Sequence, residues 1–363
     1  MDSQTSSRGT DGASSFDPDT LFECWSQGHI TTPKDNDLRS SIISTFSLTP
    51  DDSYVYHAIA SVTLSEVQAA IDHGAESGLH AWYVGGDGKP LSPPSQVDIA
   101  AYTSIFAPQT SPEKVLKGFS ANAKKGSIRS HVASYLQSHR VISPCLNTTK
   151  SKKHVNPYYD FWAWSCSNLE WAGPSQNSEK VKISHHILPV FMHHFGCVVP
   201  SYEALETIKH FTRARNKQAE RAVIDMGSGN GYWTYMLRRL AVAVDAVDNQ
   251  QSKYRTLWID DTITAEGEKY LRDNGGCKEK VLLLVYPIVS ADFTARILNA
   301  YKGDTIVVVG TQNANGYTAF RNQTIATYMS TRKRDFELIV QFPLPSFAGK
   351  DEALFVFERN LSD

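Results

Sequence analysis

The stretch Arg221-Ala-Val-Ile-Asp-Met-Gly-Ser-Gly-Asn-Gly231 decides the fold of this chain. A short β-branched run ends on Asp225, and glycine then occupies every second position from Gly227 to Gly231. Glycine permits a positive φ and lets a ligand approach the backbone where a Cβ would block it. Apolar residues follow at helical spacing over residues 232–240. The stretch therefore predicts a buried parallel strand that turns tightly into a helix, whose first backbone N–H groups can meet an anionic group.

A second apolar strand is predicted over residues 242–247, and it ends at Asp248. Asp248 lies 21 positions after Gly227, a distance that suits an acid at the tip of the neighbouring strand, within reach of ribose hydroxyls. A dinucleotide fingerprint, Gly-x-Gly-x-x-Gly, would need glycine where this chain has Tyr232. The pattern therefore indicates a nucleotide site but argues against a nicotinamide or flavin cofactor.

The run Val223-Ile-Asp-Met-Gly-Ser-Gly-Asn-Gly231, together with Asp248, resembles the first motif of the class I S-adenosylmethionine (SAM) dependent methyltransferases. In that family the loop wraps the methionine part of SAM, the acid before the loop helps to hold the amino group, and the acid after the second strand binds the ribose. The resemblance implies that SAM is the cofactor. It also implies a set of cofactor-binding residues: Asp225, Gly227, Ser228, Gly229, Asn230, Gly231, Asp248, Asn249 and Tyr286.

The fold class expected is α/β, a Rossmann-like and mostly parallel sheet with a C-terminal antiparallel hairpin, plus a mainly helical N-terminal region. We expect a disordered tail over residues 1–20, a helical lid region over 21–199 and the SAM-binding domain over 200–363. Strands are predicted at 281–287, 305–309, 336–342 and 353–358, and helices at 63–74, 97–106, 112–119, 128–139, 201–211, 265–274, 293–301 and 325–331. The terminal antiparallel pair is the ending that the resemblance implies.

The strand at 281–287 ends in Tyr286-Pro287. In many class I methyltransferases this strand ends in Asp or Asn, followed by Pro-Pro and an aromatic residue, and this group handles an amino nitrogen. Tyr286 replaces the acid or amide here, which argues against methylation of amines and makes Tyr286 the first catalytic candidate. Strand ends at one edge of a parallel sheet face the ligand. Three polar residues after the next strand are therefore predicted to contact substrate: Thr311, Gln312 and Asn313.

Residues 158–171 contain six aromatic residues in 14 positions. One interpretation is that the rings pack at the join between two domains. The other is a lid over the cofactor, because aromatic faces attract a sulfonium or ammonium cation. The second interpretation makes Tyr158 and Trp162 substrate contacts and Tyr159 a catalytic candidate. Residues 185–194 hold four histidines, but Pro189 interrupts the helical spacing, so we predict no metal site and keep His186 as a candidate base.

With 36 basic and 38 acidic residues the chain carries a net charge of -2, which gives no long-range attraction to a polyanion. Five scattered cysteines favour a reducing compartment, and no run approaches the roughly 20 apolar residues of a membrane span. We therefore expect a cytoplasmic enzyme of small-molecule metabolism, with no nucleic-acid or membrane partner. The sequence also allows a homodimer.

The predicted function is methyl transfer from SAM to a small organic molecule. Two alternatives stay open. A methyltransferase-like enzyme can attack a different carbon of SAM and release methylthioadenosine, as the azetidine-2-carboxylate synthases do, and the tyrosine candidates suit that chemistry. A non-catalytic protein with the same fold could instead bind a partner through the aromatic stretch.

Overall fold

We analysed a computed structural model, which describes residues 16–58, 60–74, 80–85, 87–144, 146, 149–181, 186–213 and 220–360. Its main feature is a seven-stranded sheet of order β5-β4-β3-β6-β7-β9-β8. The strands are β3 (Val223–Met226), β4 (Val244–Asp248), β5 (Ile263–Thr264), β6 (Val281–Val285), β7 (Thr305–Thr311), β8 (Phe336–Pro343) and β9 (Glu352–Arg359). The first five are parallel, and β9 runs antiparallel between β7 and β8. The Rossmann-like sheet with a C-terminal antiparallel pair is thus confirmed.

The central strands are buried on both faces, and successive residues belong to different cores. In β6, Leu282 and Leu284 pack with helices α11 (Gly267–Asp273), α12 (Phe293–Ala300) and α13 (Ile325–Arg332). Val281 and Leu283 face the opposite core, which includes α9 (Tyr202–Thr212), α10 (Tyr232–Arg239) and the N-terminal helices. This alternation follows from the two-residue period of a strand. The second core is continuous with the N-terminal region.

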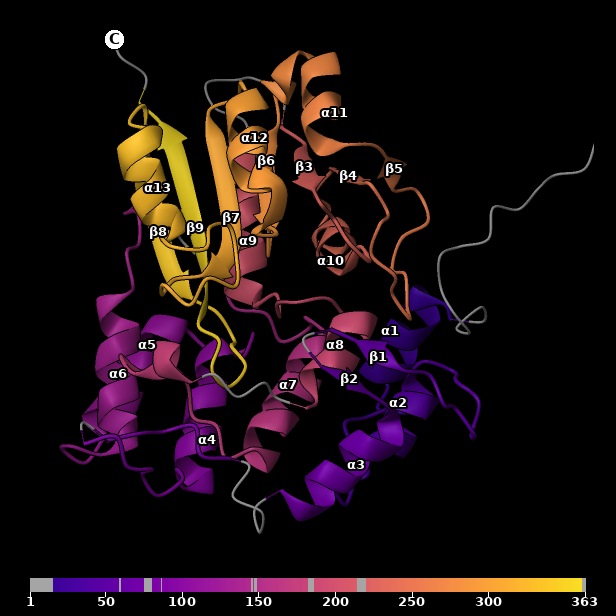
Figure 1. The fold of residues 1–363 in the computed structure, drawn as a ribbon, viewed down its shortest axis with the longest axis vertical. Helices are drawn as coiled ribbons and strands as arrows, with labels where there is room; N and C mark the ends of the chain where they lie inside the picture. The colour runs from indigo at the N-terminus through magenta and orange to yellow at the C-terminus, as the bar shows by residue number, and fades with distance from the viewer. Residues whose placement is uncertain are drawn as a thin grey trace, which may run out of the picture.

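The N-terminal region is mainly helical, as predicted, and lies beside the edge where the parallel strands end (Figure 1). Four of its helices, α3 to α6, match predicted ones; the capping box of Thr63 and Glu66 opens α3 as expected. The helices are α1 (Pro18–Ser26), α2 (Leu38–Thr45), α3 (Leu64–His73), α4 (Gln96–Thr103), α5 (Pro112–Ala121), α6 (Ile128–Ser138), α7 (Pro157–Asn168) and α8 (Leu188–His194). Among the described residues, no helix has the length and apolarity that crossing a membrane requires.

Helix α1 begins inside the stretch that we predicted as a disordered tail. Asp17 caps it by accepting from the N–H groups of Asp19 and Thr20, Pro18 stands in its first turn, and Leu21 and Phe22 are buried. The tail boundary at residue 20 is therefore corrected to before residue 17, and residues 1–15 lie outside the described part. Neither α2 nor the short antiparallel pair β1 (Tyr56–His57) and β2 (Ser61–Val62) was predicted from the sequence.

Candidate functional site

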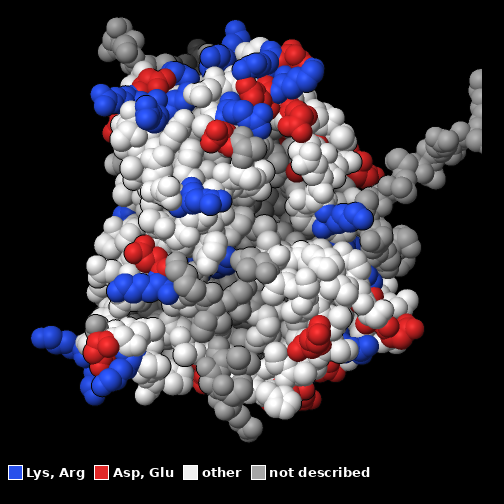
Figure 2. All heavy atoms as spheres, in the orientation of Figure 1, with Lys and Arg blue, Asp and Glu red and all other residues white. Residues whose placement is uncertain are grey.

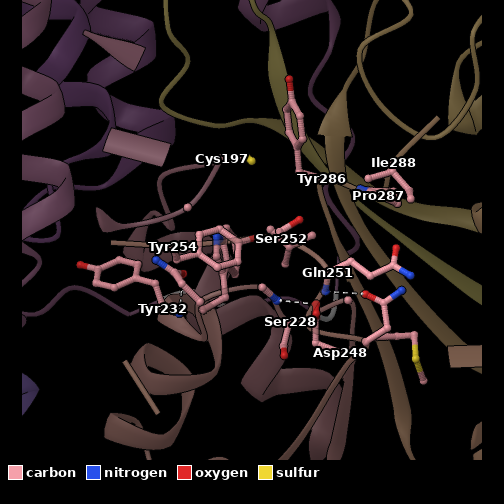
Figure 3. A pocket seen from close by; sticks show the side chains of 18 of the residues that line it. Cys197, Ser228, Tyr232, Asp248, Gln251, Ser252, Tyr254, Tyr286, Pro287 and Ile288 are labelled. Carbon is pink, nitrogen blue, oxygen red and sulfur yellow. Dashed lines mark hydrogen bonds between the residues drawn. The ribbon is translucent and has the colours of Figure 1, made fainter. Parts of the chain in front are cut away.

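A cavity of about 380 Å³ opens where β3, β4 and β6 end. Its size falls in the range of roughly 300–1,000 Å³ that is usual for small-molecule sites. One part of the lining is the glycine loop from Gly227 to Asn230, with Asp248 at the end of β4. We call this the glycine-loop end. The rest of the lining includes His57, Cys197, Tyr254 and Tyr286, which come from four separate segments and which we call the composite wall. Figure 3 shows the last three, and Tyr254 lies against Gly229 of the loop.

The glycine loop needs its glycines. Gly227, Gly229 and Gly231 all have positive φ, at 79°, 59° and 81°, which side chains with a Cβ adopt only with strain. Gly231 caps α10, and a Cβ there would collide with the side chain of Ile259. The loop therefore has the backbone shape that the alternating glycines predicted; Gly227 to Asn230 line the cavity, whereas Gly231 does not.

Asp248 connects the loop to the end of β4. Its carboxylate accepts from the N–H of Gly229 at 3.0 Å (Figure 3) and from the N–H of Gln250 at 2.6 Å. Each carboxylate oxygen has two acceptor sites, so both can accept one more hydrogen bond from a ligand. Asp248 lies on the cavity surface, as predicted for an acid that binds ribose hydroxyls.

Asp225 lies behind the loop rather than on the surface of the cavity, and its side chain is fully buried. One oxygen accepts from the Thr234 hydroxyl at 2.6 Å, while Oδ1 has no hydrogen-bond partner among the described residues. Burial raises the pKa of this carboxyl to about 7, and the nearby charge of Asp248 adds to the shift. Contact between Asp225 and a cofactor stays a prediction. In the structure the Asp225 carboxylate is bonded to Thr234 on α10, the helix that follows the loop.

The side chains of the other predicted loop residues differ in whether they already have hydrogen-bond partners. Ser228 lines the cavity, and its buried hydroxyl has no partner among the described residues. Asn230 also lines it, but its amide donates to the carbonyl of His194 at 3.1 Å, so it ties the loop to α8. Asn249 donates to Glu266 at 3.2 Å at the rim. Ser228 therefore keeps a hydroxyl without a partner among the described residues, and this hydroxyl is buried rather than open to the cavity.

Tyr286 belongs to the cavity, as predicted from its place at the end of β6. It has a φ of 50°, which is uncommon for a residue with a side chain and often marks a functional site. The ring rises from the strand end, and its hydroxyl points away from Asp248 and Ser228 (Figure 3). Burial raises the pKa of this phenol well above its ordinary value.

The sequence did not identify the rest of the composite wall. His57 belongs to β1, Tyr254 to the loop after β4, and Cys197 to the segment after α8. Burial raises the pKa of the Cys197 thiol to about 12, so this side chain is a neutral part of the wall. The only signal in the sequence was the aromatic and histidine content of these segments, which does not say which side chains meet.

The aromatic helix α7 supports the site and does not line it. Tyr158 is fully buried and donates to the carbonyl of Gly196 at 2.8 Å, next to Cys197. Tyr159 donates to the carbonyl of Thr103 at 3.0 Å, and Trp162 donates to the carbonyl of Ser346 at 3.0 Å. The placement corrects our lid interpretation: the rings pack between the N-terminal helices and the sheet.

The polar residues after β7 also lie outside the cavity lining, where we had predicted substrate contacts. The N–H of Thr311 donates to the Thr318 hydroxyl at 2.9 Å, and Gln312 donates to Asp351 at 2.8 Å. Asn313 accepts from the N–H of Asn315 at 3.2 Å. These groups therefore hold the turn and the β8–β9 connection, because polar turn residues satisfy nearby backbone groups first.

The histidines of residues 185–194 have separate environments in the described part of the chain. His186, the predicted base, does not line the cavity, and burial lowers its pKa to about 4. His193 lines the cavity and faces the Tyr54 hydroxyl and the carbonyl of His57, at 3.2 Å and 2.9 Å. His194 is buried between Tyr56 and Thr256. The structure thus uses His193 and His194 to join β1 to the loop after β4.

The residues present fit an adenosyl sulfonium ligand. The free acceptor sites of Asp248 suit ribose hydroxyls, and the exposed loop backbone suits the amino-acid part of the ligand. The buried Oδ1 of Asp225 is a hydrogen-bond acceptor without a partner among the described residues. The fold and the site together define a Rossmann-like domain with a cavity at the carboxyl ends of its parallel strands.

The sheet of this domain, with its antiparallel ending, is the Rossmann-like architecture that the sequence predicted. No protein-family model matches the chain, and a search of curated proteins gives no match. Solved structures do match. Magnesium protoporphyrin IX methyltransferase from Synechocystis PCC 6803, with bound SAM, matches 51% of this chain and 89% of its own at 12% identity, with a TM-score of 0.30.

Two further matches cover the same part of the chain. The 1,6-didemethyltoxoflavin-N1-methyltransferase of Burkholderia thailandensis, with bound S-adenosylhomocysteine, is 14% identical over 43% of this chain and 76% of its own, with a TM-score of 0.28. A candidate tRNA (m1A22) methyltransferase from Streptococcus pneumoniae is 11% identical over 44% and 70%, with a TM-score of 0.27. Matches at this level concern the fold and leave the reaction and substrate of this chain open.

Proposed function

We propose that this protein is a methyltransferase that uses SAM to methylate a small organic molecule. The observation that carries the proposal is the glycine-loop end: three glycines at positive φ, joined by the Gly229 N–H to the carboxylate of Asp248, beside an unpartnered Ser228 hydroxyl. When bound, SAM supplies a methyl group already activated on a sulfonium. The chain then has to bind SAM and the acceptor, orient them and exclude water. These tasks need little covalent chemistry from side chains.

The enclosure of the cavity supports a small acceptor. His57 and Met192 of the N-terminal region close one side, and Tyr254 adds a ring from the loop after β4. On the face that Figure 2 shows, acidic and basic side chains of the described residues are interspersed, mostly over the sheet, and do not form a block of one sign. A polyanion would favour such a block. The proposal includes a small-molecule partner and no nucleic acid.

Calorimetry with SAM and with S-adenosylhomocysteine tests this proposal. Asp248→Ala should weaken the binding of both roughly 10- to 100-fold, because it removes hydrogen bonds to a charged acceptor. Asp245→Ala is a matched control: Asp245 lies on the same strand but pairs with Lys280 away from the cavity, and its loss should leave the affinity unchanged. A wild-type chain that binds neither compound would contradict the proposal.

Product analysis separates methyl transfer from the alternative attack on another carbon of SAM. Methyl transfer yields S-adenosylhomocysteine, and the alternative yields methylthioadenosine. Of the three tyrosines that suggested the alternative, only Tyr286 lines the cavity; Tyr158 and Tyr159 use their hydroxyls on backbone carbonyls. This placement favours methyl transfer.

A further inference from the structure

Behind Tyr286 lies a buried lysine that is not paired with an acid. Lys350, in the connection between β8 and β9, is only 5% exposed. Its ammonium donates to the Tyr286 hydroxyl at a long 3.4 Å and lies 3.7 Å from the centre of the Tyr317 ring. Among the described residues no carboxylate lies within the 4.0 Å of an ion pair with it. Buried charges are normally paired, so this lysine needs an explanation.

The surroundings favour the uncharged amine. Burial lowers the pKa of Lys350, while Glu352 on β9 and Cys197 on the composite wall act in the opposite direction. Glu352 is itself buried, which raises its pKa to about 8 and so weakens its support for the ammonium near neutral pH. The other groups that face Lys350 are the neutral rings of Tyr286 and Tyr317. A lysine with a lowered pKa is a suitable proton acceptor.

Tyr286 is placed between this lysine and the cavity. It lines the cavity, whereas Lys350 does not, and its hydroxyl points away from the glycine-loop end (Figure 3). A ligand held by the loop and Asp248 would therefore leave the Tyr286 side of the cavity to the acceptor. The composite wall offers an amine no carboxylate there, since its four side chains are an imidazole, a thiol and two phenols.

We propose that Tyr286 and Lys350 form a proton relay that activates a hydroxyl acceptor, a phenol or enol, for methylation. This inference rests on the proposed function. The acceptor O–H proton passes to the Tyr286 oxygen as the Tyr286 proton passes to the neutral Lys350 amine. The acceptor oxygen forms the new bond to the methyl carbon, and the electron pair of the broken carbon–sulfur bond stays on sulfur. The positive charge thus moves from the sulfonium to Lys350, and Tyr286 ends the step protonated.

In this relay Tyr286 is the catalytic residue, and Lys350 is a positioning residue that acts through it. The arrangement explains why a tyrosine at positive φ stands at the end of β6. The 3.4 Å separation is long for a hydrogen bond, but catalytic hydrogen bonds often shorten only when the substrate is bound. The strain at Tyr286 is then part of the site, because it directs the ring toward Lys350.

Titration of the lysine tests the relay without any turnover. In protein labelled with ¹³C at lysine Cε, the resonance of Lys350 is assigned by its loss in Lys350→Met. We expect this resonance to titrate clearly below the ordinary lysine range. An ordinary titration of Lys350 would overturn the relay. SAM affinity is measured on the same samples. A wild-type protein that does not bind SAM contradicts the proposed function, whereas one that binds SAM but has an ordinary Lys350 titration contradicts only the relay.

Methyl transfer from labelled SAM to a series of substituted phenols, with matched anilines and thiophenols, tests the acceptor class. Phenols should be methylated and anilines should not. Tyr286→Phe and Lys350→Met should lose roughly 10²- to 10⁴-fold in kcat on weakly acidic phenols, the usual size of base catalysis. They should lose far less on phenols that are already ionised at the assay pH, because those need no base. Transfer to anilines alone, to no phenol, or equal losses on both kinds of phenol, would overturn the inference.

Lys350→Arg protects this test against a folding artefact. Arginine keeps a positive charge but does not lose its proton in proteins. If Lys350 serves only as a charge that holds Tyr286, Lys350→Arg should keep the wild-type rate and pH profile, which would overturn the relay. If the relay operates, Lys350→Arg should behave as Lys350→Met does while it binds SAM normally, and both should lose the rise in rate with pH that deprotonation of Lys350 gives the wild type.

Discussion

The two parts of the cavity lining, the glycine-loop end and the composite wall, are built in different ways. The glycine-loop end comes from 22 consecutive residues, Gly227 to Asp248, and its contacts are mainly backbone groups around one carboxylate. The composite wall takes His57, Cys197, Tyr254 and Tyr286 from four segments, and its contacts are side chains. Backbone geometry suits a ligand part that is always the same. Side chains gathered from several segments suit a part that differs between proteins, because each can change without altering the sheet.

The largest expected effect concerns the attachment of the composite wall to the N-terminal region. Arg255, next to Tyr254, forms an ion pair with Asp52, and both side chains are 6% exposed or less. Arg255 also lies over the Tyr54 ring at 4.3 Å. Arg255→Met leaves the Asp52 carboxylate buried without its partner, so we expect the free energy of unfolding to fall by about 3–5 kcal/mol. Urea denaturation measures the change.

Arg272→Met is the control for that loss. Arg272 pairs with Glu268 one helical turn away and is largely exposed, so its loss should cost under about 1 kcal/mol. The double variant Asp52→Leu with Arg255→Met should recover part of the stability, because it no longer buries an unpaired charge. Equal effects of Arg255→Met and Arg272→Met would show that the Asp52 pair does not hold the wall.

The same contrast explains what the sequence revealed. The glycine spacing, the position of Asp248 and the strand that ends at Tyr286 were readable because each depends on neighbours in the chain. The partners of Tyr286 were not: Lys350 and Cys197 lie 64 positions after it and 89 before it, and no spacing connects them. Tyr158 and Trp162 were assigned to substrate because composition shows that rings gather but not what they face. Helix α1 was missed because its cap and two apolar residues follow directly on a polar tail.

A second prediction tests how rigid the glycine-loop end must be. Gly231→Ala should lower the free energy of unfolding by about 1–2 kcal/mol for the positive φ and by about 1–3 kcal/mol more for displacing Ile259. Gly28→Ala is the matched control, since Gly28 also has a positive φ, of 73°, but no atom lies within 4 Å of the position of its Cβ. Thermal or urea unfolding of both variants separates the cost of a side chain at positive φ from the cost of the collision with Ile259. Equal losses would mean that Ile259 moves freely and that the loop end is less tightly packed than the structure shows.

The smallest effect concerns the buried carboxyl under the loop, and it appears as a pH dependence. Burial raises the pKa of Asp225 to about 7 in the folded protein from an ordinary 3.8. Between these values the folded state keeps a proton that the unfolded state has released, so stability falls as the pH rises from about 4 to about 7. Asp225→Asn removes this group while keeping its shape and the hydrogen bond from Thr234.

We therefore expect Asp225→Asn to match the wild type near pH 4 and to exceed its free energy of unfolding by about 2 kcal/mol at pH 6, measured without SAM. Asp351 and Glu352 are also buried with raised pKa values, so both proteins should keep a residual fall of the same sign. The difference between the two proteins isolates Asp225. A constant difference across this pH range would mean that Asp225 is ionised throughout, and the glycine-loop end would then hold a permanent charge beneath the ligand.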